Sequence, residues 1–322
     1  MEFKEVQRLV ADDMEGVNGV IRRYLHSDIA LINQIINYII SSGGKRMRPL
    51  LALLCARACG YEGEKHLIVA AITEFIHTAT LLHDDVVDNS SMRRGQETAN
   101  LVWGNESSIL VGDFVFSRSF EMMVEVGEMR VMEILAQASN TIAEGEVMQL
   151  INSHDPDSTE EHYMLVIQSK TAKLFEAASQ LGAVLAGQSP VVEEACKQYG
   201  MHIGTAFQLK DDILDYQSSP EEIGKNLGED LTEGRPTLPL IHALRNSDRI
   251  TAGLIRDAII NGGGGNMREV MDAIRDTGAI AHTLETARKH ARIAKESLEV
   301  LPENRYRRAL EGLTEFAVAR TS

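Results

Sequence analysis

The chain has 322 residues, of which 44% are apolar and 25% charged, so it is long enough to bury a sizeable core. Its 32 Lys and Arg against 47 Asp and Glu give a formal net charge of −15. So acidic a chain is not expected to bind nucleic acid, because contacts to phosphates need a basic surface. Metal ions or local clusters of basic residues would have to hold any anionic ligand.

The three cysteines, Cys55, Cys59 and Cys196, are too few for a disulfide framework, which favours a reducing compartment. Cys55 and Cys59 lie one helical turn apart in an apolar stretch, and we expect both to be buried thiols. The first residues are acidic and lack the apolar segment of a signal peptide. No apolar run approaches the ~18 residues of a membrane span. We therefore expect a cytoplasmic protein with no membrane span.

Hydrophobic periodicity is helical along nearly the whole chain. Apolar residues at intervals of three and four predict one long first helix, namely Val6, Val10, Met14, Val17 and Ile21. Further helices are expected over residues 27–43, 50–60, 65–88, 106–126, 129–151, 159–186, 190–217, 237–260, 266–277, 282–300 and 304–320. No stretch shows the alternation of a β-strand, and no domain boundary stands out. The sequence predicts an all-α fold, a single-domain helical bundle over residues 1–322.

Two segments stand out because each ends an apolar helix with three aspartates in a DDxxD pattern. These are Asp84, Asp85 and Asp88 in HDDVVD, and Asp211, Asp212 and Asp215 in KDDILD. The first and last aspartate of each pattern project from one face of the helix, and their like charges repel. A solvated acidic face would explain one such motif, but two copies among apolar residues favour a metal site. Carboxylate oxygens without a Cys or His set suit a hard cation such as Mg²⁺, which bridges carboxylates to substrate phosphates.

Basic residues suited to a phosphate ligand lie beside glycines or beside these motifs. They are Lys45, Arg46 and Arg48 in GGKRMRP, Arg93 and Arg94 in SMRRG, Lys170 in SKTAKL, and Lys225 in a glycine-rich segment. Any one of them could be a solvated surface charge, whereas the whole set favours phosphate binding. Segment 224–236 is too polar for a core and is expected to form a loop at the site. Two acidic clusters and at least two basic groups suggest two phosphorylated ligands at one site.

Six motifs follow one another along nearly the whole chain: GGKRMRP, HTATLLHDDVVDNSSMRRG, GEVMQL, SKTAKLFEAA, GTAFQLKDDILDY and GKNLGEDLTEGRPTLPL. In order and approximate spacing they resemble those of the trans-isoprenyl diphosphate synthases, or polyprenyl synthetases. The resemblance implies the isoprenoid synthase fold, a bundle around a deep central cavity, usually in a homodimer. It implies a prenyltransferase that uses Mg²⁺ to join isopentenyl diphosphate to an allylic diphosphate such as farnesyl diphosphate. The wording of the first acidic motif is most similar to bacterial members whose octaprenyl product becomes a quinone side chain.

The resemblance also implies roles for individual residues. Isopentenyl diphosphate would be bound by Lys45, Arg48, His77 and Arg94. The allylic diphosphate would sit on Mg²⁺ bridged by Asp84, Asp88 and Asp211, with Arg93, Lys170, Thr171, Gln208 and Lys225 around it. Asp85, Asp212 and Asp215 match the remaining positions of the metal motifs, where water-mediated roles are common. Ala79 and Thr80, small residues one turn before Asp84, would leave room for a growing chain.

Two positions depart from the pattern of the family. Arg235 in EGRPTLP stands where Lys is common, and Lys210 stands beside Asp211 where many relatives carry an apolar residue. We expect Lys210 to point away from the site rather than to compete with metal. Alternatives are a shorter-chain synthase or an HD-type phosphohydrolase that uses His83 and Asp84 as metal ligands. A terpene cyclase usually has a different second acidic motif, and a non-catalytic partner subunit would have lost motif residues.

Overall fold

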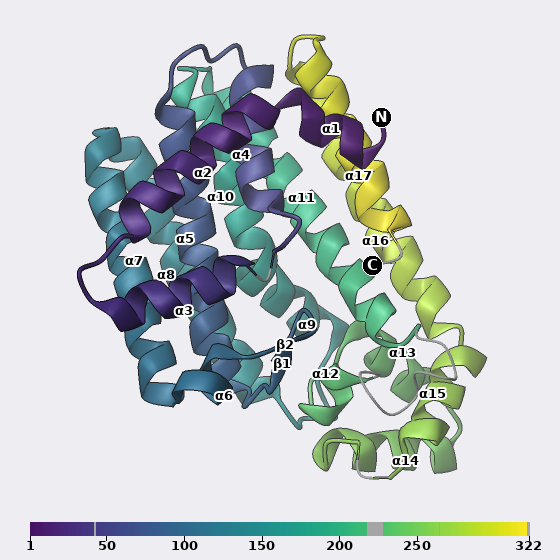
Figure 1. Ribbon diagram of the computed structural model, residues 1–322. Coiled ribbons are helices and arrows are strands. Elements are labelled where there is room, and N and C mark those ends of the chain that lie inside the picture. Colours follow the sequence, from purple (N-terminus) through teal and green to yellow (C-terminus); the bar gives the residue numbers. More distant parts are fainter. Residues whose placement is uncertain (42, 218–227, 264, 321–322) are drawn as a thin grey trace. The chain divides into compact units, whose positions relative to one another are not determined.

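A computed structural model describes residues 1–41, 43–217, 228–263 and 265–320, and these residues are almost entirely helical (Figure 1). Contacts within the chain divide it into two compact units. Unit 1 comprises Met1–Ser139, Ala177–Lys197 and Val300–Leu310, and unit 2 comprises Asn140–Glu176, Gln198–Glu299 and Glu311–Ser322. The all-α class expected from the periodicity is confirmed, and the single domain over residues 1–322 stays a prediction.

Helices follow one another along the chain with a single short hairpin among the described elements. Up to the middle of the chain the elements are α1 (Phe3–Leu9), α2 (Ala11–Leu25), α3 (Ala30–Ser41), α4 (Met47–Ala58), α5 (Lys65–Val87), β1 (Met92–Arg93), β2 (Gln96–Glu97), α6 (Ala99–Trp103), α7 (Asn105–Val126) and α8 (Met129–Asn152). There follow α9 (Glu160–Ile167), a π-helical turn (Gln168–Ala172), α10 (Lys173–Leu185), α11 (Pro190–Asp215), α12 (Glu229–Thr232), α13 (Leu238–Asn246), α14 (Arg249–Ile260), α15 (Met267–Asp276), α16 (Ala279–Ser297), a 3₁₀ turn (Leu298–Val300) and α17 (Arg305–Ala319).

Helix α5 is the central element of unit 1, because it contacts α2, α4 and α7 (Figure 1). By length and composition α5 could cross a membrane: it has 23 residues, and its most apolar 18-residue window has a mean hydropathy of 1.2. Our expectation that no segment comes near this length therefore needs correction. However, 56% of that window is buried inside the protein, and the core helix of a soluble protein passes the same test.

Helix α4 packs beside α5 with nearly every side chain buried. It begins at Met47, before Pro49 rather than after it as expected. Proline is tolerated there because an N–H in the first turn has no helical partner to lose. Burial of leucines at positions 50, 51, 53 and 54 on all sides of α4 makes this helix part of the core rather than its cover.

Unit 2 is built around the helices that follow the second acidic motif. Helix α13 contacts α14, α15 and α16, and α14 contacts α15. Their shared core includes Leu240 of α13, Ile255 and Ile259 of α14, and Val270 and Ile274 of α15, all at most 2% exposed. Each buried aliphatic side chain of this kind contributes about 1.5–3 kcal/mol through removal of apolar surface from water.

The predicted first helix is interrupted. Val10 has φ −123° and ψ 27°, outside the helical region, so the segment forms α1 and α2 instead of one helix. Val6, Val17 and Ile21 are nevertheless buried as expected, whereas Met14 is only partly so. Asp12 and the next residue are acidic, which favours a new helix N-terminus at this point. The periodicity reports which face is buried, and it persists across a break of this kind.

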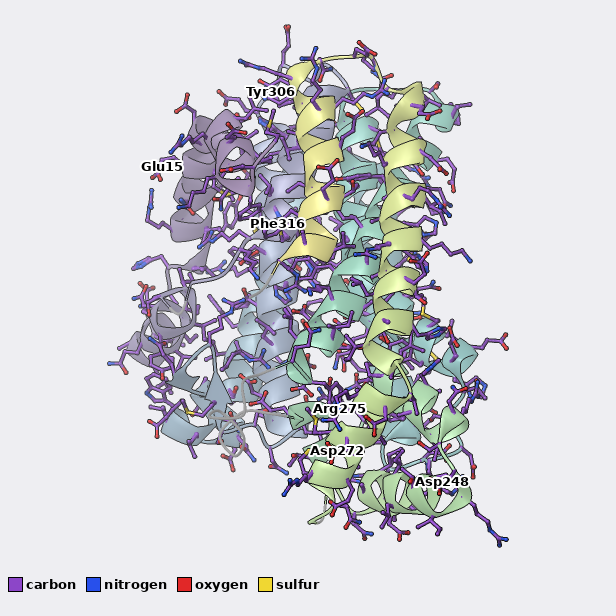
Figure 2. The ribbon with its side chains drawn as sticks, turned by 90° about the vertical axis from the view of Figure 1, so that its right-hand side faces the viewer. Glu15, Asp248, Asp272, Arg275, Tyr306 and Phe316 are labelled. Carbon is purple, nitrogen blue, oxygen red and sulfur yellow. The ribbon has the colours of Figure 1, made fainter. Side chains whose placement is uncertain are left out.

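Two later helices are also interrupted. Segment 159–186 contains the π-helical turn at Gln168–Ala172, and segment 237–260 divides at Ser247. Asp248 follows that break and caps α14 (Figure 2), because its Oδ1 accepts the N–H groups of Ile250 at 2.8 Å and of Thr251 at 3.1 Å. A side-chain cap of this type stabilises a helix start by about 1 kcal/mol.

The β-hairpin was not expected from the sequence. Its strands pair antiparallel, with Met92 opposite Glu97 and Arg93 opposite Gln96. The turn residues Arg94 and Gly95 have φ values of 53° and 78°. Positive φ at both central positions is the requirement of a tight two-residue hairpin turn, and the RRG sequence was the available signal for it.

The cysteines are buried and reduced, as predicted for Cys55 and Cys59. The Sγ atom of Cys59 lies 4.0 Å from that of Cys196. The neighbouring Cys196 thiol and burial together raise the pKa of the Cys59 thiol, which keeps it protonated and unreactive.

Candidate active site

The first acidic motif lies at the C-terminal end of α5, in unit 1. Asp88 ends the helix, and its N–H donates to the carbonyl of Asp84 at 2.8 Å. Asp84 and Asp88 are both partly exposed and lie one turn apart. The negative end of the helix macrodipole is also here and favours a cation. These features suit a hard metal ion held by carboxylate oxygens.

The middle aspartate of this motif has a different environment. Asp85 is 4% exposed, and its Oδ1 accepts from Nε of Arg93 at 2.7 Å and pairs with Nη2 of the same arginine at 2.6 Å. The carbonyl of Asp85 also accepts from the N–H of Ser90 at 3.0 Å and from Nδ2 of Asn100 at 3.2 Å. Asp85 therefore fastens the hairpin and the segment after α5 to the helix. Arg93, expected beside the allylic diphosphate, lies on Asp85 in this structure.

Three of the residues expected to bind isopentenyl diphosphate influence one another electrostatically. Burial, followed by the guanidinium groups of Arg48, Arg94 and Arg93, lowers the pKa of His77 well below its usual value. The Arg94 side chain also lies directly over Gly44, where an added Cβ would come within 2.7 Å of Arg94 Nη1. The positive charge of this cluster therefore comes from the arginines and not from the imidazole.

The fourth residue of that group, Lys45, is partly exposed just before α4. Its neighbour Arg46 has φ 48° and ψ 43°, a left-handed conformation that is uncommon for a residue with a side chain. Nη1 of Arg46 donates to Oδ1 of Asn18 at 3.0 Å. The GGKRMRP turn is thus tied to α2 by Arg46.

The two small residues before the first motif differ in exposure. Ala79 is 2% exposed inside unit 1, whereas Thr80 is partly exposed and donates its hydroxyl to the carbonyl of His77 at 2.9 Å. His83 turns toward α7 instead of Asp84, since its Nε2 lies 3.1 Å from the carbonyl oxygen of Ile109. This packing, which leaves no room for a side chain at Gly112, argues against a His–Asp metal pair of a phosphohydrolase.

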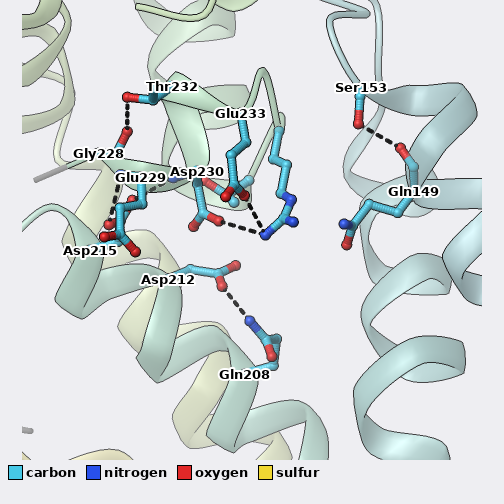
Figure 3. Close-up of polar contacts among 12 residues, drawn as sticks. Gln149, Ser153, Gln208, Asp212, Asp215, Gly228, Glu229, Asp230, Thr232 and Glu233 are labelled. Carbon is cyan, nitrogen blue, oxygen red and sulfur yellow. Dashed lines mark hydrogen bonds and ion pairs between the residues drawn. The ribbon is translucent and has the colours of Figure 1, made fainter. Parts of the chain in front are cut away.

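The second acidic motif closes α11, in unit 2 (Figure 3). Asp212 is 3% exposed and accepts hydrogen bonds from the hydroxyl of Tyr163 and from Nε2 of Gln208, the latter at 2.8 Å. The same Gln208 accepts through Oε1 from the hydroxyl of Thr171 at 3.0 Å. Two residues expected at the allylic diphosphate, Thr171 and Gln208, are thereby brought together with the middle aspartate.

Asp215 caps the short helix α12. Its two carboxylate oxygens accept the backbone N–H groups of Glu229 at 3.1 Å and Asp230 at 3.2 Å, and its carbonyl accepts that of Gly228 at 3.1 Å (Figure 3). This capping joins the end of α11 to the return of the chain after segment 218–227. Lys225 falls in that segment and lies outside the described residues.

Carboxylates are crowded around the second motif. Burial and the charge of Asp230 raise the pKa of Asp212 to about 8. Burial raises the pKa of Asp215 to about 6, and burial with the charge of Asp215 raises that of Asp230 to about 7. Arg235 compensates part of this charge, because Nη1 lies 2.8 Å from Oε2 of Glu233 and 3.8 Å from Oδ1 of Asp230. The raised pKa values mean that the ionised carboxylates are destabilised here. A bound cation would stabilise their charged form.

Lys170 lies in the π-helical turn and pairs with Oε2 of Glu146 at 2.6 Å. Gly145 makes this approach possible, since an added Cβ there would lie 2.7 Å from the backbone nitrogen of Lys170. When the side-chain amide of Gln149 is oriented with its oxygen toward Lys170 and Arg235, that oxygen accepts from Nζ of Lys170 at 3.2 Å and from Nε of Arg235 at 3.0 Å. Glu146 and Gln149 were missed as site residues, although both belong to the GEVMQL motif.

Asp211 also has a partner that sequence reasoning missed. Its Oδ1 lies 2.7 Å from Nη2 of Arg320, and the Asp211 side chain stays 45% exposed. Lys210 is 8% exposed, and burial together with the charge of Arg320 lowers its pKa. The basic side chain that pairs with Asp211 here is therefore that of Arg320. The orientation expected for Lys210, away from the site, remains a prediction.

Each acidic motif, taken by itself, has carboxylates that fit a metal ion held partly by its substrate. Among the described residues, no three His, Cys, Asp or Glu side chains form a ready-made metal cage. Mg²⁺ does not need one, because it is usually bound by one or two carboxylates together with substrate phosphates and water. Partly exposed carboxylates at Asp84 and Asp88, and at Asp211, fit that mode of binding.

Comparisons with known proteins point to one family. A family model described as polyprenyl synthetase matches residues 29–276. The octaprenyl diphosphate synthase of Escherichia coli K12 is 52% identical over 321 residues, which cover 99% of each chain. A polyprenyl synthase from Caulobacter crescentus CB15, solved with calcium and isoprenyl diphosphate, is 46% identical with a TM-score of 0.95, covering 100% of this chain and 98% of that one.

A third relative extends the comparison to another product. A decaprenyl diphosphate synthase from Rhodobacter capsulatus is 42% identical with a TM-score of 0.94, and the alignment covers 100% of both chains. The expected helical isoprenoid synthase fold and the expected prenyltransferase activity are both confirmed by these relatives. The chain belongs to the polyprenyl synthetase family and is a long-chain prenyltransferase.

Proposed function

We propose that the protein condenses isopentenyl diphosphate, head to tail, onto an allylic diphosphate such as farnesyl diphosphate and releases octaprenyl diphosphate for quinone side chains. The observation that carries the proposal is the pair of DDxxD motifs, each at the C-terminal end of a helix with a partly exposed carboxylate. The similarity to an octaprenyl diphosphate synthase over nearly the whole chain supports the product length.

The homoallylic substrate is assigned to unit 1. Lys45, Arg48 and Arg94 supply positive charge for its diphosphate, and Arg forks match phosphate oxygens in pairs. His77 is neutral at pH 7 because its pKa is lowered, so it binds as a hydrogen-bonding group rather than as a cation. A diphosphate that bound here would neutralise the mutual repulsion of these arginines.

The allylic diphosphate is assigned to the acidic motifs and to Lys170, Thr171, Gln208 and Lys225. Bound Mg²⁺ would neutralise the charge that develops on the departing diphosphate. Lys170 would contribute a point charge to the same group, and its contacts with Glu146 and Gln149 hold its ammonium in place. The double bond of isopentenyl diphosphate then attacks the allylic carbon, and the proton that is lost can pass to the released diphosphate.

Product analysis tests this proposal. Purified protein is incubated with radiolabelled isopentenyl diphosphate, farnesyl diphosphate and Mg²⁺, and the dephosphorylated products are separated by chromatography. We expect a ladder that ends at the octaprenyl alcohol, and no product after chelation of the metal. Products that end at farnesyl or geranylgeranyl length would favour a shorter-chain synthase. Release of phosphate without elongation would favour a hydrolase.

Ala79 offers a separate test of product length. Ala79→Phe places a large ring at a position that is 2% exposed, one turn before Asp84. If the growing chain passes this residue, the variant should fold, remain active and release shorter products. If Ala79 only packs between helices, the variant should lose about 1–3 kcal/mol of stability and keep its product length. We expect shorter products.

We also propose a cytoplasmic homodimer without a membrane span. Apolar side chains are exposed along α6 and α7 in unit 1, namely Leu101, Val102, Ile109, Leu110, Phe120 and Val124, each at least 41% exposed. Contiguous exposed apolar patches usually mark interfaces, and these side chains are our candidates for one. Light scattering coupled to size-exclusion chromatography should give twice the chain mass of 35.6 kDa. Leu110→Glu should shift the protein toward the monomer.

A further inference from the structure

The surroundings of Asp211 contain a feature that the proposed function does not use. Arg320 follows α17, and its guanidinium reaches the first aspartate of the second acidic motif within unit 2. Nη2 of Arg320 lies 2.7 Å from Oδ1 of Asp211. The two residues are far apart in sequence, and both side chains belong to described parts of the chain.

The guanidinium is fixed independently of Asp211. Nη2 of Arg320 also donates to the carbonyl of Phe207 at 2.8 Å, and its central carbon lies 3.9 Å above the centre of the Phe207 ring. The Phe207 ring itself packs against Phe175, with 5.7 Å between ring centres. A planar cation stacked on an aromatic face and bonded to a carbonyl has little freedom to turn. Arg320 is thus a rigid donor held against α11 beside Asp211.

Exposure divides the roles of the two partners. The Arg320 side chain is 3% exposed, whereas that of Asp211 is 45% exposed. Oδ1 of Asp211 is occupied by the fixed guanidinium, while much of its carboxylate remains accessible from solvent. The contact therefore restricts the rotation of the carboxylate without covering it.

We infer that Arg320 is a positioning residue for metal binding: it holds Oδ1 of Asp211 so that the carboxylate is presented to a divalent cation in one orientation. This inference rests on the proposed function, because it uses Asp211 as a metal ligand. Partners that hold a ligating carboxylate typically change metal affinity about 10- to 100-fold when they are removed. The inference makes Arg320, the residue directly after α17, part of the candidate metal site.

A purely structural role predicts a different outcome. Arg320 also joins the end of α17 to α11 through Phe207, and loss of that contact alone would lower stability and leave metal affinity unchanged. The experiment must therefore measure metal binding directly rather than activity.

Mn²⁺ binding to the metal-free full-length protein, followed by electron paramagnetic resonance, makes this measurement. Wild type is compared with Arg320→Met, which keeps the bulk and removes the charge, and with Arg320→Lys, which keeps the charge. Arg308→Met, at an exposed position of α17, is the matched control. We expect Arg320→Met to weaken Mn²⁺ binding about 10- to 100-fold, Arg320→Lys to recover part of the loss, and Arg308→Met to bind like wild type.

A double variant shows whether Arg320 changes Mn²⁺ affinity by acting on Asp211. In Asp211→Asn protein, Arg320→Met should cause no further loss of Mn²⁺ affinity. The Mg²⁺ concentration for half-maximal turnover should rise in Arg320→Met, with KM for isopentenyl diphosphate unchanged.

Two results would overturn the inference: unchanged Mn²⁺ affinity in Arg320→Met with a lower melting temperature, or tighter Mn²⁺ binding, which would make Arg320 a competitor of the metal. Failure of the proposed function has a separate signature, since wild type would then bind Mn²⁺ and form no elongated product.

Discussion

The two acidic motifs share one sequence pattern and differ in what their aspartates contact. In both motifs the middle aspartate is buried and bonded, Asp85 to Arg93 and Asp212 to Tyr163 and Gln208. The last aspartates are both partly exposed and each ends a helix, but Asp215 also caps the start of α12. The motifs therefore do not offer six equivalent ligands.

This difference shows that aspartates of one repeated motif can have different roles, some as expected metal ligands and others as acceptors that hold neighbouring segments. Asp84, Asp88 and Asp211 are partly exposed and are the three aspartates that we expect to hold the metal. The others organise the chain around them: Asp85 holds the hairpin and Asp215 holds the segment after the loop. The surroundings also differ in charge, since arginines gather near the first motif and carboxylates near the second.

The largest effect should follow the loss of a metal-facing carboxylate. Asp84→Ala and Asp211→Ala should each lower turnover by at least ~10²-fold, the scale of one lost electrostatic contact in a transition state. Incorporation of labelled isopentenyl diphosphate measures this. Asp257→Ala, an exposed aspartate on α14, is the control and should be as active as wild type. Near-normal turnover in both motif variants, with unchanged circular dichroism, would refute the metal assignment.

A smaller effect should separate the two substrates. Arg48→Ala should raise KM for isopentenyl diphosphate about tenfold with kcat little changed, because it removes ground-state binding worth about 1.4 kcal/mol. Lys170→Ala should instead lower kcat, because its charge acts on the leaving group. Steady-state kinetics with each substrate varied in turn makes the comparison. If both variants change the same constants, the division of substrates between the basic groups is wrong.

The contrast between Asp88 and Asp215 can be tested by stability. Asp215→Ala removes the acceptor for two backbone N–H groups of α12 and should cost about 1 kcal/mol, measured by urea unfolding. Asp215→Ser restores a side-chain acceptor and should recover much of that loss. Asp88→Ala should lower the free energy of unfolding less than either substitution at Asp215. Equal losses for Asp215→Ala and Asp215→Ser would show that capping is not what Asp215 contributes.

The smallest effect is a dependence of stability on pH. The pKa values of Asp212, Asp215 and Asp230 are raised from 3.8 to about 8, 6 and 7, so the folded chain binds more protons than the unfolded chain across this range. Stability of the metal-free protein should therefore fall as pH rises from 7 to 8.5, lowering the melting temperature by a few degrees.

Scanning fluorimetry at several pH values checks this, and Asp230→Asn should flatten the profile. His290 does not obscure this window, because burial lowers its pKa to about 4 and its contribution to stability changes only as pH falls below about 6.5. A melting temperature that rises with pH between 7 and 8.5 would contradict the raised pKa values.

The sequence predicted what depends on local pattern. Helices such as α5 and α7 begin and end within a residue or two of expectation, because long apolar stripes with clear ends specify them. The motifs predicted which aspartates lie together on a helix. They did not predict the burial of Asp85 or Asp212, because a partner such as Tyr163 comes from another helix.

Arg320 is the clearest case of a contact that the sequence does not reveal. It stands in no motif, and its distance from Asp211 along the chain gives no signal. Glu146 could have been found, since it belongs to the GEVMQL motif. Its pairing with Lys170 depends on the close helix contact that Gly145 permits, which the motif does not reveal. Tertiary packing, rather than pattern, decides such partners.

The π-helical turn at Gln168–Ala172 has a consequence for insertions and deletions. A π turn holds one more residue than an α turn, so a single deletion there could be absorbed as ordinary α-helix while α9 and α10 keep their course. Each residue of an α-helix turns the chain by about 100°, so the deletion would rotate Lys170 away from Glu146. Removing one residue at this turn should therefore separate folding from catalysis without replacing a single side chain of the site.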